Sequence, residues 1–509
     1  MRIKRTLQNS AYAIASYALI AILGLVMRKV FLVYLNTDYL GFEGFFGDLF
    51  TILSVGELGI AGIIQYRVYR AIAEDNHDDE RKIMSIYKLL YRIVGTAIVV
   101  IGICVVPFFK YFIKGNTLNW RDVYFIYALQ LLSAACNYFL AYKRIMIVAH
   151  LREAEITKIE TACTLGGYLL KIFIIIFFKS YILYLAVNIF INIAANYIIA
   201  RKVDRDYPYI KEQSKVTRDD IRELQIGKDL KNNIVQKISM AIYSGTDNIL
   251  ITTLIGIYET GLISNYTLIV NQVSRVLTKI LDPFQASIAN YVHSEGAGEH
   301  DDMFHMFDRL GFFAACFIST SFFVLFNPFI ELFFGAEFLM PMTYVIALVS
   351  NQYITYNHKF LSYYRGAFGR FELDKPYVVT AAVLNLVMSI ILSKPLGVAG
   401  IMLGTSIGHM GFWIGRVRVV YSEYMNEHVS RYVIRQVANA LLCGGEIAVT
   451  YYICSLLGNN LLGFILKMLL CVAIPNVINF VLFYRTKDMK QILNYVSKSI
   501  SVIRNKTNE

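Results

Sequence analysis

The sequence predicts an all-α membrane protein that crosses the bilayer about fourteen times. Its 509 residues are 56% hydrophobic and only 17% charged, which is too apolar for a soluble chain of this length. Apolar stretches of about 20 residues, enough for a helix to cross the hydrocarbon core, recur along the whole chain. The strands of a β-barrel would alternate apolar and polar residues, whereas these stretches are continuously apolar, so a barrel is excluded.

The expected spans are joined by short connections. They lie at about residues 9–35, 42–64, 93–113, 122–142, 159–178, 180–200, 233–256, 260–285, 310–334, 340–362, 376–393, 397–421, 433–456 and 461–483. The first expected span follows a basic segment, as the apolar region of a signal peptide does. Its apolar part is too long for a signal peptide, however, and no convincing cleavage site follows it. We therefore expect it to be a retained helix.

Lysine and arginine are distributed unevenly between the two sides of the membrane. With the N-terminus inside, most of the 49 basic residues fall in cytoplasmic segments. The external loops hold about five of them, Lys110, Lys114, Arg121, Lys179 and Lys394. The positive-inside rule then places both termini in the cytoplasm. The net charge of +12 thus indicates orientation and affinity for anionic membrane lipids, and it gives no reason to expect a nucleic-acid partner.

The order of the spans suggests two six-helix lobes in a pseudo-twofold arrangement, followed by two extra helices. An offset of about 220 residues aligns Tyr39-Leu40-Gly41 with Glu259-Thr260-Gly261, and each triplet opens a long helix. Parallel repeats of this kind are typical of transporters whose site lies between the halves. The expected parts are an N-terminal lobe at 1–203, a cytoplasmic linker at 204–228, a C-terminal lobe at 229–422, the two extra spans at 431–484 and a cytoplasmic tail at 485–509.

The chain carries no motif for enzymatic chemistry. It has no GxxxxGK[ST] loop for ATP and no HExxH, and its eight histidines form no ligand cluster. The seven cysteines are odd in number, form no CxxC pair and lie within spans, which favours core residues over disulfides or a zinc site. We therefore expect no catalytic residue, no metal and no organic cofactor. A membrane glycosyltransferase would also need a large external loop, and no external connection exceeds about a dozen residues.

Ionisable residues inside the spans are the remaining candidates for function, because they are costly in hydrocarbon. In the first span Arg28 and Lys29 lie about two turns from the outer end, at the depth of Asp48 in the second span. A pair between Asp48 and one of these cations is the favoured interpretation. The two cations could also snorkel to the interface without binding a ligand.

Another group of charges lies in the seventh, eighth and second spans. Arg275 and Lys279 share one helix face, and the favoured role for this pair is substrate contact. For Asp247 and Asp282 we favour internal salt bridges. Glu57, between Gly56 and Gly59, could carry a coupling proton, hold an arginine such as Arg275 or lock two helices together, and the salt-bridge role is favoured.

Lys467 lies near one end of the last span, so it is expected to snorkel toward the interface.

Several stretches resemble bacterial oligosaccharide flippases of the Wzx type, in the multidrug/oligosaccharidyl-lipid/polysaccharide exporter superfamily. They are LSVGELGIAGIIQYRVYRAIAEDN (53–76), ILYLAVNIFINIAANYIIARKVDRDYPYI (182–210), SGTDNILITTLIG (244–256), ISNYTLIVNQV (263–273) and VLNLVMSIILSKPLGVAGIMLGTSIG (383–408). The resemblance covers most of the chain, from about residue 5 to 485, and these stretches follow one another in the family's order.

The resemblance implies a two-lobed fold and movement of undecaprenyl-diphosphate-linked oligosaccharide from the inner to the outer leaflet. It makes Arg28, Lys29, Arg275 and Lys279 the candidates for contacting pyrophosphate or glycan. Asp48, Glu57, Asp247 and Asp282 are candidate charge partners or coupling groups, with H+ or Na+ as the possible coupling ion. Capsule, exopolysaccharide or O-antigen synthesis, the bacterial plasma membrane and a partnership with a polysaccharide polymerase are implied as well. The alternative is a cation-coupled multidrug or metabolite antiporter of the same superfamily.

Overall fold

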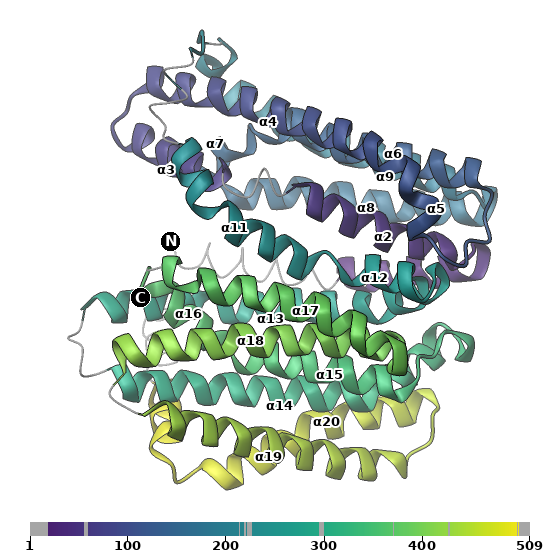
Figure 1. Ribbon diagram of the computed structural model, residues 1–509, viewed down its shortest axis with the longest axis vertical. Coiled ribbons are helices and arrows are strands. Elements are labelled where there is room, and N and C mark those ends of the chain that lie inside the picture. Colours follow the sequence, from purple (N-terminus) through teal and green to yellow (C-terminus); the bar gives the residue numbers. More distant parts are fainter. Residues whose placement is uncertain are drawn as a thin grey trace, which may run out of the picture. The chain divides into compact units, whose positions relative to one another are not determined.

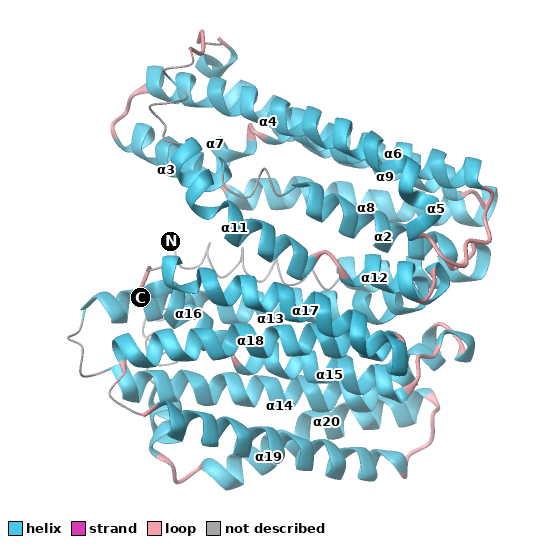
Figure 2. Ribbon diagram, in the orientation of Figure 1, coloured by secondary structure: helices cyan, strands magenta, loops and turns pink. Residues whose placement is uncertain are grey.

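The computed structural model describes residues 19–54, 60–212, 214–217, 220, 226–294, 300–369, 371–425, 428–495 and 497. Within these ranges the chain is a succession of helices and contains no strand (Figure 2). Among the described residues, nine helices are long and apolar enough to cross a membrane. The predicted class, an all-α polytopic membrane protein, is therefore confirmed.

The chain divides into two compact units, Met1–Gln272 and Val273–Glu509. The first unit holds a helix at 19–34 and then α2 (Asp38–Leu53), α3 (Ile60–Ala73), α4 (His77–Val105), α5 (Phe109–Phe112), α6 (Trp120–Ala141), α7 (Arg144–Ala149), α8 (Glu153–Phe178), α9 (Tyr181–Asp206), α11 (Ile226–Ser244) and α12 (Asp247–Leu254). Short 3₁₀ turns lie at Val106–Phe108 and Pro208–Lys211. The long helix α13 (Ile257–Ser294) begins in the first unit and ends in the second.

The second unit continues with α14 (His300–Phe333), α15 (Met342–Asn357), α16 (Lys359–Ala367), α17 (Lys375–Leu396), α18 (Val398–Tyr424), α19 (Val429–Ser455) and α20 (Leu461–Phe483), with 3₁₀ turns at Ala336–Phe338 and Phe371–Asp374. Inside this unit α14 packs against α15, α19 and α20 (Figure 1). The lobe, linker and tail boundaries expected from the sequence stay predictions.

Five expected spans are absent from the nine apolar helices, for identifiable reasons. The first lies partly outside the described residues, as does the junction between α2 and α3. The seventh is divided at Gly245–Thr246 into α11 and α12, and the tenth is divided at His358 into α15 and α16. The eighth, α13, is continuous, but polar and charged side chains lower its mean hydropathy. Interrupted and polar helices are where transporters place their sites.

Side-chain caps show why several helices begin where they do. Asn76 Oδ1 accepts a hydrogen bond of 3.1 Å from the Asp79 amide at the start of α4, and Asn460 Oδ1 accepts one of 2.7 Å from the Gly463 amide at the start of α20. Ser180 does the same for α9, through the Leu183 amide at 3.4 Å. Each cap satisfies an amide that the helix itself leaves without an acceptor.

Glycines allow α18 to lie directly on α17. A stripe of five faces α17 along its length, Gly400, Gly404, Gly408, Gly411 and Gly415. A Cβ atom at Gly400 would lie 2.0 Å from the Leu392 carbonyl oxygen, and one at Gly404 would lie 2.3 Å from the Ser389 amide nitrogen. Small residues at such spacing let helix backbones approach closely in a membrane. The stripe fixes the α17–α18 hairpin as one rigid piece.

The beginnings of α2 and α13 meet through two glycines. A Cβ atom at Gly41 would lie 2.1 Å from the carbonyl oxygen of Ile257, and one at Gly261 would lie 2.4 Å from that of Thr37. Residues 37 and 41 become 257 and 261 at the offset of 220 residues found in the sequence. The contact is therefore reciprocal, as an isologous contact between two related elements must be.

The segment after α9 is fastened to α4 rather than standing apart from it. The Tyr209 hydroxyl donates to Glu80 at 2.6 Å, and the Ser214 amide donates to the Ser85 hydroxyl at 3.1 Å. Lys82 Nζ lies 2.7 Å from Asp220 Oδ1. Hydrogen bonds from Lys82 and Thr217 lower the pKa of Asp220 to about 2, so this anchor stays ionised at physiological pH.

Replacing Gly41 by alanine should destabilise the protein, because the added methyl group meets backbone atoms that cannot rotate away. Overpacking of this kind costs about 1–3 kcal/mol. We expect the Gly41→Ala variant to show a lower apparent melting temperature in detergent than the wild type. Gly47 lies on the same helix with nothing within 4 Å of its Cβ position, so Gly47→Ala is the matched control. Equal melting temperatures for the two variants would contradict the close crossing.

Candidate functional site

The first unit contains a polar cavity of about 350 Å³ between α2, α6, α8 and α9. Its polar and charged lining residues are Glu43, Gln130, Ser133, Asn137, Lys171, Tyr184 and Asn188. A lysine and a glutamate on the walls of one cavity inside a membrane protein are costly unless each charge is compensated. The contacts of these two residues therefore decide what the cavity can do.

Lys171 is held in place by a neighbouring amide and an aromatic ring. Its side chain is 8% exposed and Nζ donates to Asn188 Oδ1 at 2.7 Å. The ammonium also lies 4.9 Å from the ring centroid of Tyr184. Cation–π and amide contacts of this kind compensate part of the lost hydration of a lysine. The helices α8 and α9 thus fix one cation at the cavity wall.

Glu43 provides the opposite charge from α2. The Tyr181 hydroxyl donates to Glu43 Oε1 at 3.3 Å, and the Tyr181 ring stacks on Tyr39 with centroids 4.2 Å apart. Arg28 and Lys171 are the two cations that act electrostatically on this carboxylate. Glu43 was not among the site residues predicted from the sequence. Its position near the start of an apolar span, four residues after Tyr39, was the available signal.

Arg28 is bonded to the opening of α13. Its Nη1 atom donates to Ser264 Oγ at 2.8 Å and contacts Asn265 Oδ1 at 3.5 Å. Asn265 is fully buried, whereas Arg28 is half-buried. The guanidinium of Arg28 is therefore bonded to groups inside the protein. Lys29, the next residue, is exposed and has no partner among the described side chains. The two neighbouring cations are thus in different environments.

Asp48 does not pair with Arg28 or Lys29, so the favoured pairing was wrong. Its Oδ2 atom accepts a hydrogen bond of 2.9 Å from the Asn248 amide, in the first turn of α12. The face of α2 that carries Asp48 is turned toward α12, where free helix amides attract a carboxylate. Asp247 is the first residue of α12, also where a negative charge is favoured.

Arg275 and Lys279 belong to the second unit and form an exposed stripe on α13. Another face of this helix packs inside the unit: Ser274 Oγ accepts from the Tyr356 hydroxyl at 2.8 Å, and Asp282 Oδ1 accepts from Tyr363 at 2.8 Å. Neither cation has a hydrogen-bond or ion-pair partner in the described part of the chain. Asp282 therefore binds a hydroxyl, where a salt bridge was expected.

Glu57 lies outside the described residues, together with Gly56 and Gly59. Its three possible roles stay predictions.

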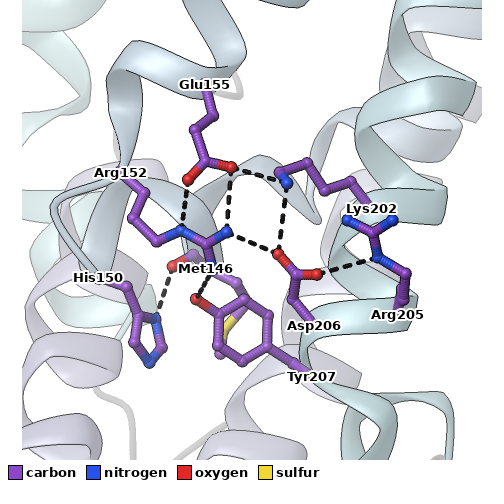
Figure 3. Close-up of polar contacts among 8 residues, drawn as sticks. All are labelled: Met146, His150, Arg152, Glu155, Lys202, Arg205, Asp206 and Tyr207. Atoms are coloured by element: carbon purple, nitrogen blue, oxygen red, sulfur yellow. Dashed lines mark hydrogen bonds and ion pairs between the residues drawn. The ribbon is translucent and has the colours of Figure 1, made fainter.

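A separate ion cluster closes one end of the first unit, where α7, α8 and α9 meet (Figure 3). Arg152 binds Glu155 through both carboxylate oxygens, at 2.7 and 3.0 Å, and reaches Asp206 at 2.8 Å. Lys202 Nζ lies 2.7 Å from Glu155 and 3.5 Å from Asp206. The bond to Glu155 is the main cause that holds the pKa of Arg152 above its ordinary value. Every charge drawn here has an opposite partner, so the cluster fastens helix ends and leaves no site for a ligand.

Comparison with known proteins gives a likeness of fold. No family model matches the chain, and no curated protein matches its sequence. Among solved structures, the lipid II flippase MurJ in an inward closed conformation matches with a TM-score of 0.65 and 14% identity, over 93% of this chain and 99% of that one. The chain has the fold of a membrane transporter.

An inward-facing multidrug resistance MATE family transporter of the MOP superfamily matches with a TM-score of 0.56 and 14% identity, over 80% of this chain and 96% of that one. The match to MurJ covers more of this chain, but both neighbours are similar to it at low sequence identity. The shared fold therefore identifies an architecture, and the residues of this chain have to carry the case for its substrate.

The charges of Glu43 and Lys171 should be energetically coupled through the cavity. We expect the Glu43→Gln and Lys171→Met variants each to lower the apparent melting temperature, because each leaves the other charge less compensated. The double variant should lose less stability than the sum of the two, with a coupling of about 0.5–3 kcal/mol.

The control for this cycle is Asn137→Ala, which removes a neutral side chain from the same cavity. Combined with Glu43→Gln it should be nearly additive. Additive losses in the Glu43–Lys171 cycle as well would mean that the two charges do not interact.

Proposed function

We propose that the protein is a flippase that moves undecaprenyl-diphosphate-linked oligosaccharide from the inner to the outer leaflet by alternating access. The proposal rests chiefly on the exposed cations of α13, Arg275 and Lys279, which have no protein partner among the described residues. A cation inside a span needs water or an anion beside it. A diphosphate supplies two linked anionic groups, and the planar guanidinium binds such oxygens through two parallel hydrogen bonds.

Arg28 and Lys29 are proposed as further contacts for the diphosphate or the glycan. Lys29 is exposed and so is available to a ligand, whereas Arg28 would have to share its guanidinium with Ser264. Since a guanidinium carries five N–H donors, these bonds leave most of them for other acceptors.

An apolar cavity in the second unit supports a substrate with a hydrocarbon chain. It measures about 720 Å³ and lies among α14, α15, α18 and α19. Its walls include Tyr353, Ile354, Trp413, Ile414, Val437 and Ile447. Its volume and lining suit part of a polyprenyl chain, since such surfaces bind hydrocarbon by excluding water. A purely hydrophilic substrate would gain no binding free energy from these apolar walls.

Transport of this kind needs a driving force, and we propose H+ or Na+ as the coupling ion. Of the carboxylates, Glu43 is the best placed to respond to a cation, because it lines a polar cavity beside Lys171. Asp48 and Asp282 are weaker candidates, because each carboxylate already accepts a hydrogen bond within the protein. Asp48 accepts one from the Asn248 amide, and Asp282 accepts one from the Tyr363 hydroxyl. Glu57 and Asp247 stay candidates from the sequence.

A multidrug or metabolite antiporter is the second candidate function. It is favoured by the glutamate and tyrosines around the cavity of the first unit, because carboxylates and aromatic faces attract organic cations. The unpartnered cations on α13 argue against it, since they would repel such substrates.

The cellular setting follows from the flippase proposal. We place the protein in a bacterial plasma membrane with both termini in the cytoplasm, serving capsule, exopolysaccharide or O-antigen-type synthesis. Lipid-linked oligosaccharide and anionic lipids would be its partners, and the polymerase that consumes the flipped units would act next.

The test uses purified protein in proteoliposomes loaded with a fluorescent polyprenyl-diphosphate oligosaccharide. We expect wild-type protein to expose the glycan to an external glycosidase or quencher, and the Arg275→Ala/Lys279→Ala variant to lose at least about 90% of that rate. Loss of two charge-assisted contacts explains an effect of this size.

Lys394 is an exposed lysine at the end of α17, so Lys394→Ala is the matched control and should keep the wild-type rate. An unchanged transport rate in the Arg275→Ala/Lys279→Ala variant would show that these two residues do not belong to the substrate site. Export of cationic dyes with no movement of the glycolipid would favour the antiporter.

A further inference from the structure

A second polar cavity lies in the second unit, at the ends of α14, α19 and α20 farthest from the C-terminal tail. It measures about 320 Å³. Its polar lining residues are Asn327, Glu331, Tyr451, Ser455, Asn459 and Lys467, and the flippase proposal gives no role to any of them. This polar lining comes from α14, from the two helices that follow the repeat, α19 and α20, and from the loop that joins these two.

Lys467 is the group that makes this cavity unusual. Seven residues into the strongly apolar helix α20, it was expected to snorkel to the interface, but the structure shows its side chain only 4% exposed. Snorkelling fails because the side chain points into the bundle toward α19 and the loop before α20. Nζ donates to Asn459 Oδ1 at 2.7 Å, a single neutral acceptor for a group with three donors.

The loop before α20 holds that acceptor rigidly. Asn460 caps α20, and a Cβ atom on Gly463 would lie 2.1 Å from the Gly458 carbonyl oxygen, so the loop folds tightly over the first turn. Asn459 therefore projects toward Lys467 from a fixed backbone. Its own amide donates to Glu331 Oε2 at 3.4 Å.

No ion pair joins Lys467 to Glu331 within the described residues, so the ammonium has no anionic partner at contact distance there. The burial of an uncompensated lysine costs several kcal/mol. An anion in the cavity would remove that cost, since Lys467 lines it directly.

The remaining wall residues of this cavity are apolar, and they limit which class of anion can bind there. Phe323, Val324, Pro328 and Leu457 line the same cavity as the lysine. A small inorganic anion would leave these surfaces unused, whereas an anion attached to hydrocarbon would cover them. Phosphate esters of lipids have this combination, and a lysine is a suitable point charge for phosphate.

We propose that this cavity binds the phosphate headgroup of a lipid, with the phosphate on Lys467 and Asn459 and the first part of the apolar chain against α14 and α19. The phosphate could come from a membrane phospholipid or from the polyprenyl-phosphate carrier of a flipped glycan. Binding by the first source is independent of the flippase proposal, and binding by the second deepens it.

Native mass spectrometry of the full-length protein in detergent tests this site. Phosphatidylglycerol and undecaprenyl phosphate are titrated separately against the wild type and Lys467→Met, which keeps the length of the side chain without its charge. We expect the variant to bind one of the two lipids at least about tenfold more weakly, the loss that corresponds to one charge-assisted hydrogen bond.

Two control variants separate charge from shape and the site from the surface. Lys467→Arg should keep most of the binding, and Lys394→Met should bind like the wild type because that lysine is exposed elsewhere. Selective loss of phosphatidylglycerol identifies the phospholipid source, and selective loss of undecaprenyl phosphate identifies the carrier. If Lys467→Met binds both lipids as the wild type does, the proposed site is wrong. This readout needs no transport, so it can fail while the flippase proposal stands, or the reverse.

Discussion

The crossing of α2 and α13 at Gly41 and Gly261 is the contact on which the charge chemistry of the first unit depends. Because neither glycine has a side chain, the two helix openings meet backbone to backbone. That approach brings Ser264 and Asn265 within reach of Arg28, and Glu43 follows Gly41 by half a turn toward the polar cavity. A bulkier pair would separate the helices and leave these polar groups without partners in a medium that offers none.

The charged residues of the chain fall into two groups with different consequences. Lys171, Arg28 and the cluster around Arg152 are bonded within the protein, so they fix helices relative to each other. Arg275, Lys279 and Lys29 are exposed and have no partner in the part of the chain that the structure describes. Groups of the first kind supply rigidity. Groups of the second kind keep their binding capacity for something that arrives from outside, which is why the substrate proposal rests on them.

The fold could be predicted from the sequence because hydrocarbon imposes a strong length and polarity requirement on each span. The 220-residue offset also aligned Gly41 with Gly261, and the structure places both glycines where α2 and α13 cross. Side-chain partners could not be predicted in the same way. Depth along a helix placed Asp48 level with Arg28, but depth says nothing about rotation, and Asp48 faces α12 instead. Lys467 shows the same limit, because its place near a helix end suggested the interface whereas its direction buries it.

The fastening of the segment after α9 to α4 limits how far α11 can travel. Asp220 is held by Lys82, and α11 begins at Ile226. Six residue steps of extended chain span at most about 20 Å. While the ion pair between Lys82 and Asp220 is intact, the first turn of α11 stays within this distance of Asp220, which is held against α4. A larger displacement of α11 would first have to break the ion pair between Lys82 and Asp220. The pair therefore limits the movement of α11 as well as stabilising the fold.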